Sequence, residues 1–499
     1  MKNEIVKLAE MGFDEKAVRL LEFNYAAQNV VIPVKFDDSH LVVAFNVNSA
    51  ITMLDDIADI TGFHISPVFA EEEDIKFYLN KFFREEKIDS IVTSFLIETK
   101  NKINIEMADE LLIEVSSAPS VQFIDSIIET GILNRASDIH IEPYGKTLRA
   151  RYRVDGELIT YSQVDISLIS SVISRLKIMG GMDISEKRRP QDGRFTIETK
   201  HGKVDFRLST LPTVNGEKIV LRLLFGQSNR LKKEELGFYE DDLNELTKLF
   251  NQPYGAIFMT GPTGSGKSTT LNSFLSELNH DNRNIISIED PVENPILGVN
   301  HVNVERYVGL DFANTLRHIL RQDPDIIMVG EIRDEETARI AMQAAITGHV
   351  VLSTLHTNDA AGVVERLLDM GIEPYFAAAA LNGVISQRLV RRICRECVCK
   401  TSLTPDQARI LNLPINTVVN KGLGCEFCNF TGYKSRFAVY EYIIIDEFKR
   451  RFITKEPSRF AEEERKKQGL NKSAVRALLN GHTTAAEVIK VLSRENLSQ

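Results

Sequence analysis

A nine-residue segment, GPTGSGKST at 261–269, constrains the fold of this 499-residue chain more than any other feature. The apolar run GAIFMT precedes it and a helix-forming stretch follows it, which is the setting in which such a pattern forms a phosphate-binding loop. Its glycines let successive backbone N–H groups point inward at phosphate oxygens, and the N-terminus of the following helix adds partial positive charge. The segment therefore predicts a P-loop domain that binds a nucleoside triphosphate.

The side chains of this loop predict how ATP and Mg²⁺ would be held. Lys267 is expected to reach the β- and γ-phosphates, and the Ser268 hydroxyl to bind Mg²⁺. We also expect Lys267 to face solvent, so that its removal would cost no packing. The predicted nucleotide-contacting residues are Gly261, Pro262, Thr263, Gly264, Ser265, Gly266, Lys267, Ser268 and Thr269.

Acidic residues follow two of the predicted strands. DIIMVGE ends in Gly330 and Glu331, so glycine stands where many P-loop enzymes carry the aspartate of an acidic pair. SIEDPVE supplies Glu289, Asp290 and Glu293. Because parallel strands deliver their carboxyl ends to one ligand-binding edge, Glu289 and Glu331 are candidates for water activation and for a place near Mg²⁺. Asp290 and Glu293 could equally cap helices or pair with arginines.

Two histidines bracket the strand VVLSTL. His349 precedes it and His356 follows it. A lone histidine is often structural, but these two could instead sense the γ-phosphate. Both alternatives stay open at this point.

All five cysteines fall between residues 394 and 428. Two Cys-x2-Cys pairs predict a closed structural Zn²⁺ site, whereas buried free thiols are the alternative. The predicted ligands are Cys394, Cys397, Cys425 and Cys428. Cys399 is either spare or a substitute for Cys397, and the 27 intervening residues are expected to fold as a lobe.

Changes in pattern along the chain predict three domains. Residues 1–90 read as a small α/β unit, 91–104 as a linker, 105–226 as a second domain, 227–237 as a linker and 238–499 as the P-loop domain. In the last of these, the apolar runs GAIFMTG, NIISIED, DIIMVGE and HVVLSTL alternate with helices, which is typical of a parallel sheet covered on both faces.

Finer patterns predict individual elements. In the first domain, VIPVKF and HLVVAF predict a hairpin, followed by a helix near 50–59, the strand HISPVFA and a helix through Phe83. In the second, a helix over 120–131 leads into SDIHIEP, a hairpin turning at Asp155-Gly156 and a further antiparallel pair. The tail, 446–499, reads as helical, with Thr484 and Glu487 forming a capping box for the last helix.

Composition weighs mildly against some partners and locations. The formal net charge of −10 argues against nucleic acid as the main partner, because such proteins usually carry a basic face. The chain starts without a secretory signal and contains no apolar run of about 18 residues, so we expect a cytoplasmic protein.

Seven motifs in a fixed order resemble the secretion ATPase superfamily, specifically the type II secretion and type IV pilus assembly ATPases. They are RASDIHIEP, RRPQDGR, DFRLSTLPTVNGEKIVLRLL, GPTGSGKSTT, SIEDPVE, LRQDPDIIMVGEIRDEETA and TGHVVLSTLHTNDA. The resemblance covers about residues 115–499. It implies an α/β fold: a RecA-like P-loop ATPase domain with a cysteine-bound metal lobe, preceded by a PAS-like α+β domain and a small N-terminal α/β domain.

The resemblance also implies roles and partners. Glu289 matches a candidate general base, Glu331 the Walker B glutamate, and the two histidines the family's His box. Arg207 and Arg222 match arginines that the second domain moves onto the γ-phosphate, and Arg317 and Arg321 match further phosphate-side arginines. The implied assembly is a homohexamer acting on an inner-membrane platform protein to add pilin-like subunits to a filament.

The remaining expectations concern how the protein is held at the membrane and which branch of the superfamily it belongs to. The N-terminal domain is expected to bind the cytoplasmic domain of a membrane-anchored adaptor, which would hold the motor peripherally at the inner membrane. A DNA-translocating P-loop ATPase and a pilus retraction motor remain alternatives, and a nucleotide-binding regulator is a third. The short segment before residue 30 favours the secretion branch slightly over the pilus branch.

Overall fold

The computed structural model describes residues 6, 8, 11–37, 40–46, 53–83, 119–199, 202–225, 231–467 and 469–496. The chain divides into two compact units, Met1–Ile197 with Asp205–Leu223, and Glu198–Val204 with Leu224–Gln499. The predicted linker 91–104 lies outside the described residues, as do residues 227–230 of the predicted linker 227–237. The predicted domain boundaries therefore stay predictions.

The N-terminal part is a three-stranded sheet with helices. β1 (Val31–Asp37) pairs antiparallel with β2 (His40–Asn46), and β2 pairs parallel with β3 (His64–Ala70). The helices are α1 (Glu15–Val18), α2 (Phe23–Asn29), α3 (Met53–Thr61) and α4 (Glu72–Phe82). The predicted hairpin and third strand are confirmed. The start of the helix predicted at 50–59 lies outside the described residues.

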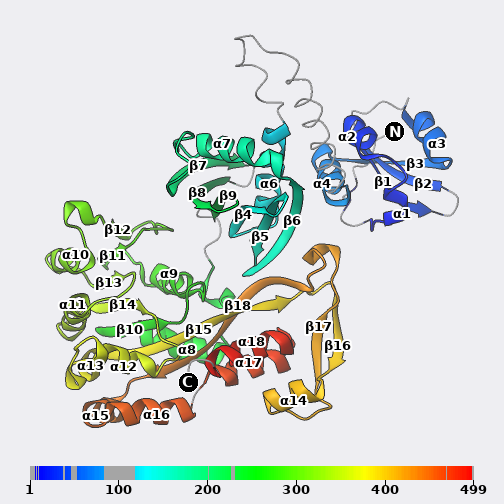
Figure 1. Ribbon diagram of the computed structural model, residues 1–499. Helices are drawn as coiled ribbons and strands as arrows, with labels where there is room; N and C mark the ends of the chain where they lie inside the picture. The colour runs from blue at the N-terminus through cyan, green and yellow to red at the C-terminus, as the bar shows by residue number, and fades with distance from the viewer. Residues whose placement is uncertain are drawn as a thin grey trace. The chain divides into compact units, whose positions relative to one another are not determined.

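A six-stranded sheet follows, in the order β6-β5-β4-β9-β8-β7 (Figure 1). Its strands are β4 (Asp138–Tyr144), β5 (Thr147–Val154), β6 (Glu157–Asp165), β7 (Gln191–Thr199), β8 (Gly202–Thr213) and β9 (Gly216–Phe225), with helices α6 (Pro119–Leu133) and α7 (Ile169–Met179). Side chains alternate along β5: Leu148, Ala150 and Tyr152 are buried, and the Tyr152 hydroxyl donates to the Ile127 carbonyl of α6 (2.8 Å). The helices therefore cover one face of the sheet, and the polar residues that alternate with the buried ones lie on its other face.

The second unit is built on a seven-stranded sheet in the order β12-β11-β13-β14-β10-β15-β18. The strands are β10 (Gly255–Thr260), β11 (Ile285–Glu289), β12 (Asn300–Asn303), β13 (Ile326–Val329), β14 (Val350–Leu355), β15 (Leu381–Ile393) and β18 (Tyr433–Ile444). All neighbouring pairs are parallel except β15 with β18. The predicted parallel sheet is confirmed, and its buried β10, β11, β13 and β14 match the continuous apolar runs.

Helices cover both faces of this sheet. The core on one face includes α8 (Glu240–Phe250) and α9 (Lys267–Leu278), whereas the core on the other includes α10 (Phe312–Ile319), α11 (Glu335–Ile346), α12 (Gly362–Asp369) and α13 (Pro374–Ala380). Because α9 opens directly after β10, the loop 261–266 lies at the carboxyl edge of the sheet. That edge is where ligands bind in α/β folds.

A lobe is inserted between β15 and β18 and extends away from the sheet in Figure 1. It holds β16 (Val398–Ser402), α14 (Pro405–Leu411), β17 (Val418–Gly422) and a short 3-10 turn at Glu426–Cys428. The helical tail follows as α15 (Glu447–Lys455), α16 (Pro457–Lys467), α17 (Leu470–Leu479) and α18 (Ala485–Asn496). Within the described ranges, no helix is both long enough and apolar enough to cross a bilayer.

The capping box predicted for α18 forms only in part. The Thr484 hydroxyl accepts a hydrogen bond from the Glu487 backbone N–H (3.4 Å). The Glu487 carboxylate instead accepts from the backbone N–H and the guanidinium of Arg391 (3.0 and 2.8 Å). An arginine on β15 outcompetes the helix's own first turn, because a charged donor binds a carboxylate more strongly than a neutral amide does.

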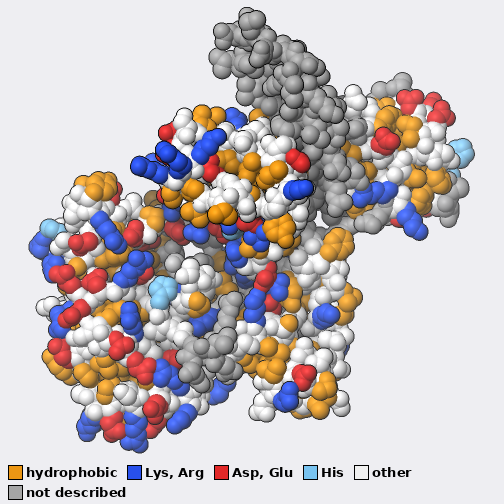
Figure 2. Space-filling view, viewed as in Figure 1, with side chains coloured by type: hydrophobic (Ala, Val, Ile, Leu, Met, Phe, Trp, Pro, Cys, Tyr) orange, Lys and Arg blue, Asp and Glu red, His pale blue; other side chains and the backbone are white. Residues whose placement is uncertain are grey.

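Surface charge on the tail is mixed rather than basic (Figure 2). On α15 and α16, Arg451 pairs with Glu447 (3.3 Å), and Arg459 pairs with Glu456 and Glu463 (2.9 and 3.2 Å). Such exposed pairs contribute little stability, but they neutralise the positive charge that a nucleic-acid surface needs.

Candidate nucleotide and metal sites

The P-loop is shaped by three glycines with positive φ. Gly261, Gly264 and Gly266 have φ of 143°, 77° and 87°, in the region that only glycine enters at low cost. Space is also short: a Cβ on Gly261 would lie 2.5 Å from the Gln387 carbonyl oxygen of β15. A Cβ on Gly266 would lie 2.7 Å from the Gln387 Nε2. The close approach of β15, as well as the curl of the loop, therefore requires glycine at both positions.

The expectation that Lys267 faces solvent is wrong. The side chain is 8% exposed, and its ammonium donates to the carbonyls of Gly261 (2.7 Å) and Pro262 (3.1 Å). Burial, with the Arg388 charge nearby, lowers its pKa to about 8, although Glu331 acts in the opposite direction. The curled loop turns its own carbonyls toward the ammonium, which the sequence motif alone does not reveal.

Gln387 of β15 braces the loop from behind, and its neighbour Arg388 bonds the segment after β14. Gln387, 1% exposed, donates from Nε2 to the Ser265 carbonyl and accepts from the Thr270 hydroxyl, both at 2.8 Å. Arg388 donates to the Asn358 carbonyl (2.5 Å) and the Gln387 carbonyl (3.0 Å). Sequence reasoning missed both; the available signal was the adjacent Gln and Arg in the mainly apolar run LNGVISQRLV.

The two candidate acids lie on neighbouring strands. Ile288 of β11 pairs with Val329 of β13, so Glu289 and Gly330 come next to each other at the carboxyl edge. Gly330 donates its N–H to the Ile288 carbonyl (2.8 Å), and a Cβ there would stand 3.2 Å from that oxygen. The close approach of the two strands favours glycine at this position, where many P-loop enzymes carry an aspartate.

Glu331 lies between Arg333 and His356. One carboxylate oxygen accepts from Arg333 (2.6 Å), and the other is 3.8 Å from the Nε2 of His356. Burial, followed by the Lys267 charge, lowers the pKa of His356, while Glu331 raises it. The structure therefore brings Lys267, Glu331 and His356 close enough to interact, and their roles toward a phosphate stay predictions.

Glu289 is anchored by a residue that sequence reasoning missed. Its Oε1 accepts from the Ser287 hydroxyl (2.7 Å) and lies 3.0 Å from the Nδ1 of His301 on β12. The side chains of Glu289 and His301 are 11% and 10% exposed. His301 stands in GVNHVNV, where the lone histidine gave no chemical pattern to detect.

The other histidine and two predicted arginines lie elsewhere in this unit. The His349 carbonyl accepts from Gly255 N–H (3.0 Å) at the amino edge of β10, the edge opposite the P-loop. Arg317 and Arg321 lie on and just after α10, which covers the face opposite α9. Among the described residues, Arg317 pairs with Glu336 and Asn314, and Arg321 contacts His318 (2.6 Å). The structure therefore brings none of the three to the P-loop of its own chain.

The remaining acids of SIEDPVE have minor contacts. Asp290 lies 3.8 Å from the exposed Arg306. This agrees with the alternative that it pairs with an arginine.

Arg207 and Arg222 lie in the first unit, on the helix-free face of the six-stranded sheet. Buried Phe206, Leu208 and Leu221 alternate with them toward the helices. Arg222 pairs with Asp138 of β4 (3.0 Å) while its side chain stays 62% exposed. Thr196 of β7 donates to Asp205 of β8 (2.6 Å), and this register places Arg194 beside Arg207.

The register of β4, β5 and β9 extends this line of charge. Asp138 pairs with Arg222 on one side and Arg153 on the other. Asp138 therefore lies between two arginines on neighbouring strands, and Arg194 and Arg207 form a pair of like charges on β7 and β8. Like charges opposite each other destabilise a sheet, so an anion bound beside the Arg194–Arg207 pair would offset their repulsion.

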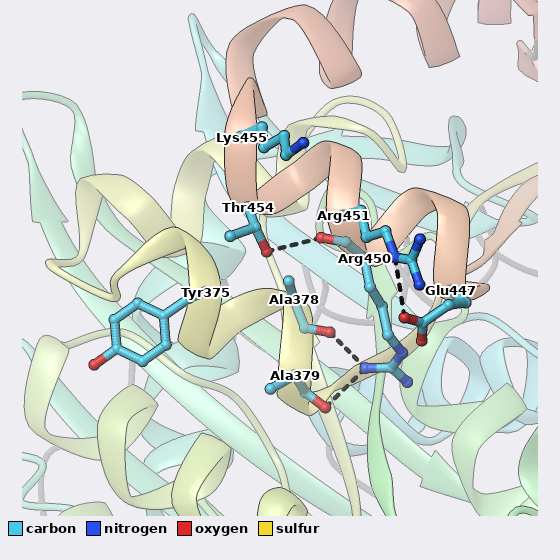
Figure 3. Close-up of a pocket in the computed structure, with 8 residues that line it drawn as sticks. All are labelled: Tyr375, Ala378, Ala379, Glu447, Arg450, Arg451, Thr454 and Lys455. Atoms are coloured by element: carbon cyan, nitrogen blue, oxygen red, sulfur yellow. Dashed lines mark hydrogen bonds and ion pairs between the residues drawn. The ribbon is translucent and has the colours of Figure 1, made fainter.

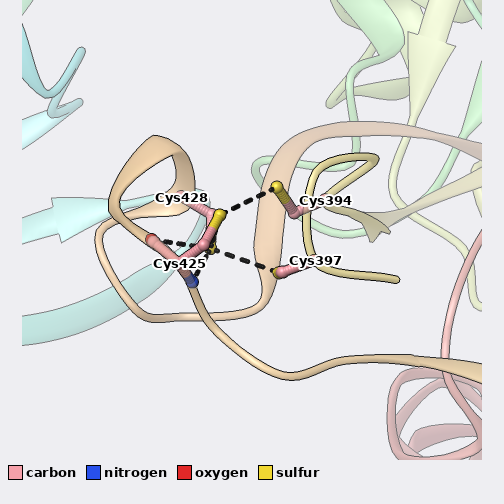
Figure 4. A group of neighbouring side chains, drawn as sticks. All are labelled: Cys394, Cys397, Cys425 and Cys428. Atoms are coloured by element: carbon pink, nitrogen blue, oxygen red, sulfur yellow. Dashed lines mark hydrogen bonds between the residues drawn. The ribbon is translucent and has the colours of Figure 1, made fainter. Parts of the chain in front are cut away.

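Four cysteine sulfurs form a compact group (Figure 4). The Sγ atoms of Cys394, Cys397, Cys425 and Cys428 all lie within 4.8 Å of one another, with three of the pairs at 3.8 Å. A tetrahedral Zn²⁺ with Zn–S bonds of about 2.3 Å would separate its sulfurs by about 3.8 Å. The group therefore fits zinc, and Cys399 lies outside it, on β16.

Backbone N–H groups support these sulfurs. Gly424 donates to Cys397 (3.3 Å), and Cys425 and Gly432 donate to Cys428 (both 3.2 Å). Burial raises the pKa of Cys428, but the two N–H donors together with the thiols of Cys425 and Cys397 outweigh it and bring the pKa to about 7. At Cys397 burial and the neighbouring thiols prevail over the single Gly424 donor and raise the pKa to about 12. Donors of this kind stabilise thiolates, the form in which cysteine binds a metal.

A pocket of about 290 Å³ between α13 and α15 lies apart from these sites (Figure 3). Arg450 occupies its floor and donates to the carbonyls of Ala378, Ala379 (2.7 Å) and to Asn382 (2.8 Å). Asn382 in turn donates to the Tyr254 carbonyl just before β10. The pocket therefore lies at the amino edge of the sheet, opposite the P-loop, and is lined by residues of α13 and α15.

Comparison with known proteins agrees with this geometry. A family described as type II/IV secretion system protein matches residues 114–490. The chain belongs to this family. A second family, the MshEN domain, matches residues 4–89, so the resemblance extends over the N-terminal part as well.

Named relatives cover most of the chain. The type IV pilus assembly ATPase PilB of Myxococcus xanthus is 40% identical over 497 residues, 97% of this chain and 88% of that protein. The putative type II secretion system protein E of Escherichia coli K12 is 45% identical over 390 residues, 77% of this chain and 79% of that protein.

Solved structures share the fold. The Legionella pneumophila ATPase DotB aligns with a TM-score of 0.56 and 22% identity over 74% of this chain and 95% of that one. The pilus retraction motor PilT with bound ADP aligns with a TM-score of 0.50 and 25% identity over 73% of this chain and 95% of that one. The predicted P-loop ATPase fold is confirmed.

Proposed function

We propose that this protein hydrolyses ATP to drive the assembly of a type IV pilus or a type II secretion pseudopilus. The observation that carries the proposal is the P-loop at the carboxyl edge of the sheet, with Glu331 close to Lys267 and Glu289 at the same edge of the sheet. Membership of a secretion family supports the cellular role. The names of the two relatives support assembly or secretion over DNA translocation and over retraction.

The catalytic assignments follow from position and chemistry. Lys267 supplies positive charge for the transferring phosphoryl group, and Glu289, at the end of β11, accepts the proton of the attacking water. Ser268 is exposed in the first turn of α9, and its hydroxyl with the Glu331 carboxylate offers the hard oxygen ligands that Mg²⁺ prefers. Bound Mg²⁺ would neutralise phosphate charge during transfer.

The proposed partners complete the role. We assign the active form to a homohexamer that works on an inner-membrane platform protein, with residues 1–90 bound to the cytoplasmic part of an adaptor. Arg207 and Arg222 are proposed to reach the phosphates when the second domain closes, and Arg317, Arg321 and His349 to serve the nucleotide of a neighbouring subunit. Zn²⁺ is proposed as the ion of the cysteine group. The match to PilB over nearly the whole chain weighs against the slight preference for secretion.

Substitution of Lys267 tests the hydrolysis. Lys267→Ala should abolish turnover, because loss of one such charge typically removes several kcal/mol of transition-state stabilisation. Near-parent turnover in this variant would contradict the proposal. Deletion of the gene would then separate the branches, since loss of surface pili indicates one and loss of exoprotein export the other.

A further inference from the structure

We propose that His301 is a positioning residue for the Glu289 carboxylate. Together with Ser287 it holds one oxygen of that carboxylate in place, so that the other oxygen faces the attacking water. This rests on the proposed ATP hydrolysis and deepens it. The evidence is a set of three polar atoms in mutual hydrogen-bond range. The Ser287 Oγ is 2.7 Å from both Glu289 Oε1 and His301 Nδ1, and those two atoms are 3.0 Å apart.

The tautomer of His301 is fixed by the other side of its ring. The backbone N–H of Ile296, a residue 4% exposed, donates to His301 Nε2 (2.7 Å). A backbone N–H can only donate, so Nε2 must be the unprotonated acceptor and Nδ1 must carry the ring proton. The imidazole therefore presents a donor to Glu289 and Ser287, and protonating it would break the bond to Ile296.

Both donors converge on the same carboxylate oxygen. The Ser287 hydroxyl donates to Oε1, and the His301 Nδ1–H points at the same atom. Ser287 is fully buried and the His301 side chain is 10% exposed, so water does not readily replace either donor. Oε1 is thereby the anchored oxygen, and Oε2 is the oxygen left to accept a proton.

This arrangement serves a general base. A base must lie within hydrogen-bond reach of the water and keep one orientation, and two fixed donors restrict rotation of the carboxylate about its last bond. The strands impose the register: Ser287 pairs with His301 in the parallel β11–β12 ladder, and Glu289 is two residues on, on the same face. β12 at the sheet edge thus contributes to catalysis without touching the nucleotide loop.

The test compares three variants of the full-length chain. His301→Leu should lower kcat at least tenfold while the KM for ATP stays within about twofold, because misorienting a base slows the chemical step and spares ground-state binding. His301→Gln should restore most of kcat, since a carboxamide can accept from Ile296 and donate to Glu289. His482→Leu is the matched control: His482 is another partly buried histidine, packed edge-on against Phe437 far along the chain.

The outcomes separate the alternatives. Equal kcat in His301→Leu and His482→Leu, compared at equal folded fraction, would overturn the positioning role, as would failure of His301→Gln to rescue. A rise in KM with kcat unchanged would likewise count against it. If the parent hexamer itself does not hydrolyse ATP, the proposed function fails instead, so the two failures are distinguishable.

Discussion

The bracing of the P-loop by Gln387 gives a prediction whose size can be worked out from hydrogen bonds. Gln387→Leu keeps about the same side-chain volume but removes the amide group that bonds both the Ser265 carbonyl and the Thr270 hydroxyl. The Ser265 carbonyl and the Thr270 hydroxyl, in residues 3% and 0% exposed, would then be buried without a partner. Each such group costs about 1–3 kcal/mol, so the loss is about 2–6 kcal/mol.

Calorimetry of the full chain, run on parent and variants side by side, measures this loss. A second substitution isolates one contribution. Thr270→Val, added to Gln387→Leu, removes the orphaned hydroxyl and should recover about 1–3 kcal/mol of the unfolding free energy. Gln252→Leu, at an exposed position after α8, should change stability by no more than about 0.5 kcal/mol. The reasoning is refuted if Gln387→Leu is as stable as Gln252→Leu, or if Thr270→Val gives no recovery.

Three further predictions concern the other sites. Freshly purified protein should contain close to one zinc per chain by metal analysis, and absence of zinc would contradict this. Cys425→Ser should loosen the lobe while ATP binding persists, because structural zinc contributes folding energy locally. Arg207→Ala and Arg222→Ala should each cut turnover at least tenfold, because both arginines are proposed to reach the phosphates when the second domain closes. Thermal stability should change little, since an exposed ion pair contributes at most about 1 kcal/mol. Parent turnover rates in both hexameric variants would exclude this role. Deleting residues 1–90 should leave ATPase activity and abolish filament assembly in cells, and normal assembly would rule out a docking role.

The sequence predicted the parts of the fold that depend on local patterns. Apolar runs such as IISIE and VVLSTL stand out because strands buried on both faces need no polar alternation, and the Asp155-Gly156 turn forms because both residues have positive φ. The cysteine spacing likewise predicted the group that forms, because two Cys-x2-Cys turns need only one lobe to bring them together.

What sequence could not predict are pairings between distant strands. His301 meets Glu289 only because β12 pairs with β11, and Gln387 reaches the P-loop only because β15 pairs with β10. Lys267 was misjudged for a related reason: its partners are backbone carbonyls, which no residue type encodes. Arg317 and His349 were placed near the phosphates by resemblance, and a single chain does not bring them there.

The length of β15 has a mechanical consequence. The strand holds the P-loop through Gln387, and seven residues further along it delivers Cys394, about 23 Å away at about 3.3 Å per residue. Between these points β15 is paired with β18, up to the Ile393–Tyr433 pair. Over this span the ribbon also packs against α17 and α18, and Arg391 pairs with Glu487 of α18, so the ribbon is held along its length and not only at the P-loop. A tilt at the nucleotide would therefore move the ribbon, the lobe and these two helices together, and the cysteine group keeps the far ends of both strands joined.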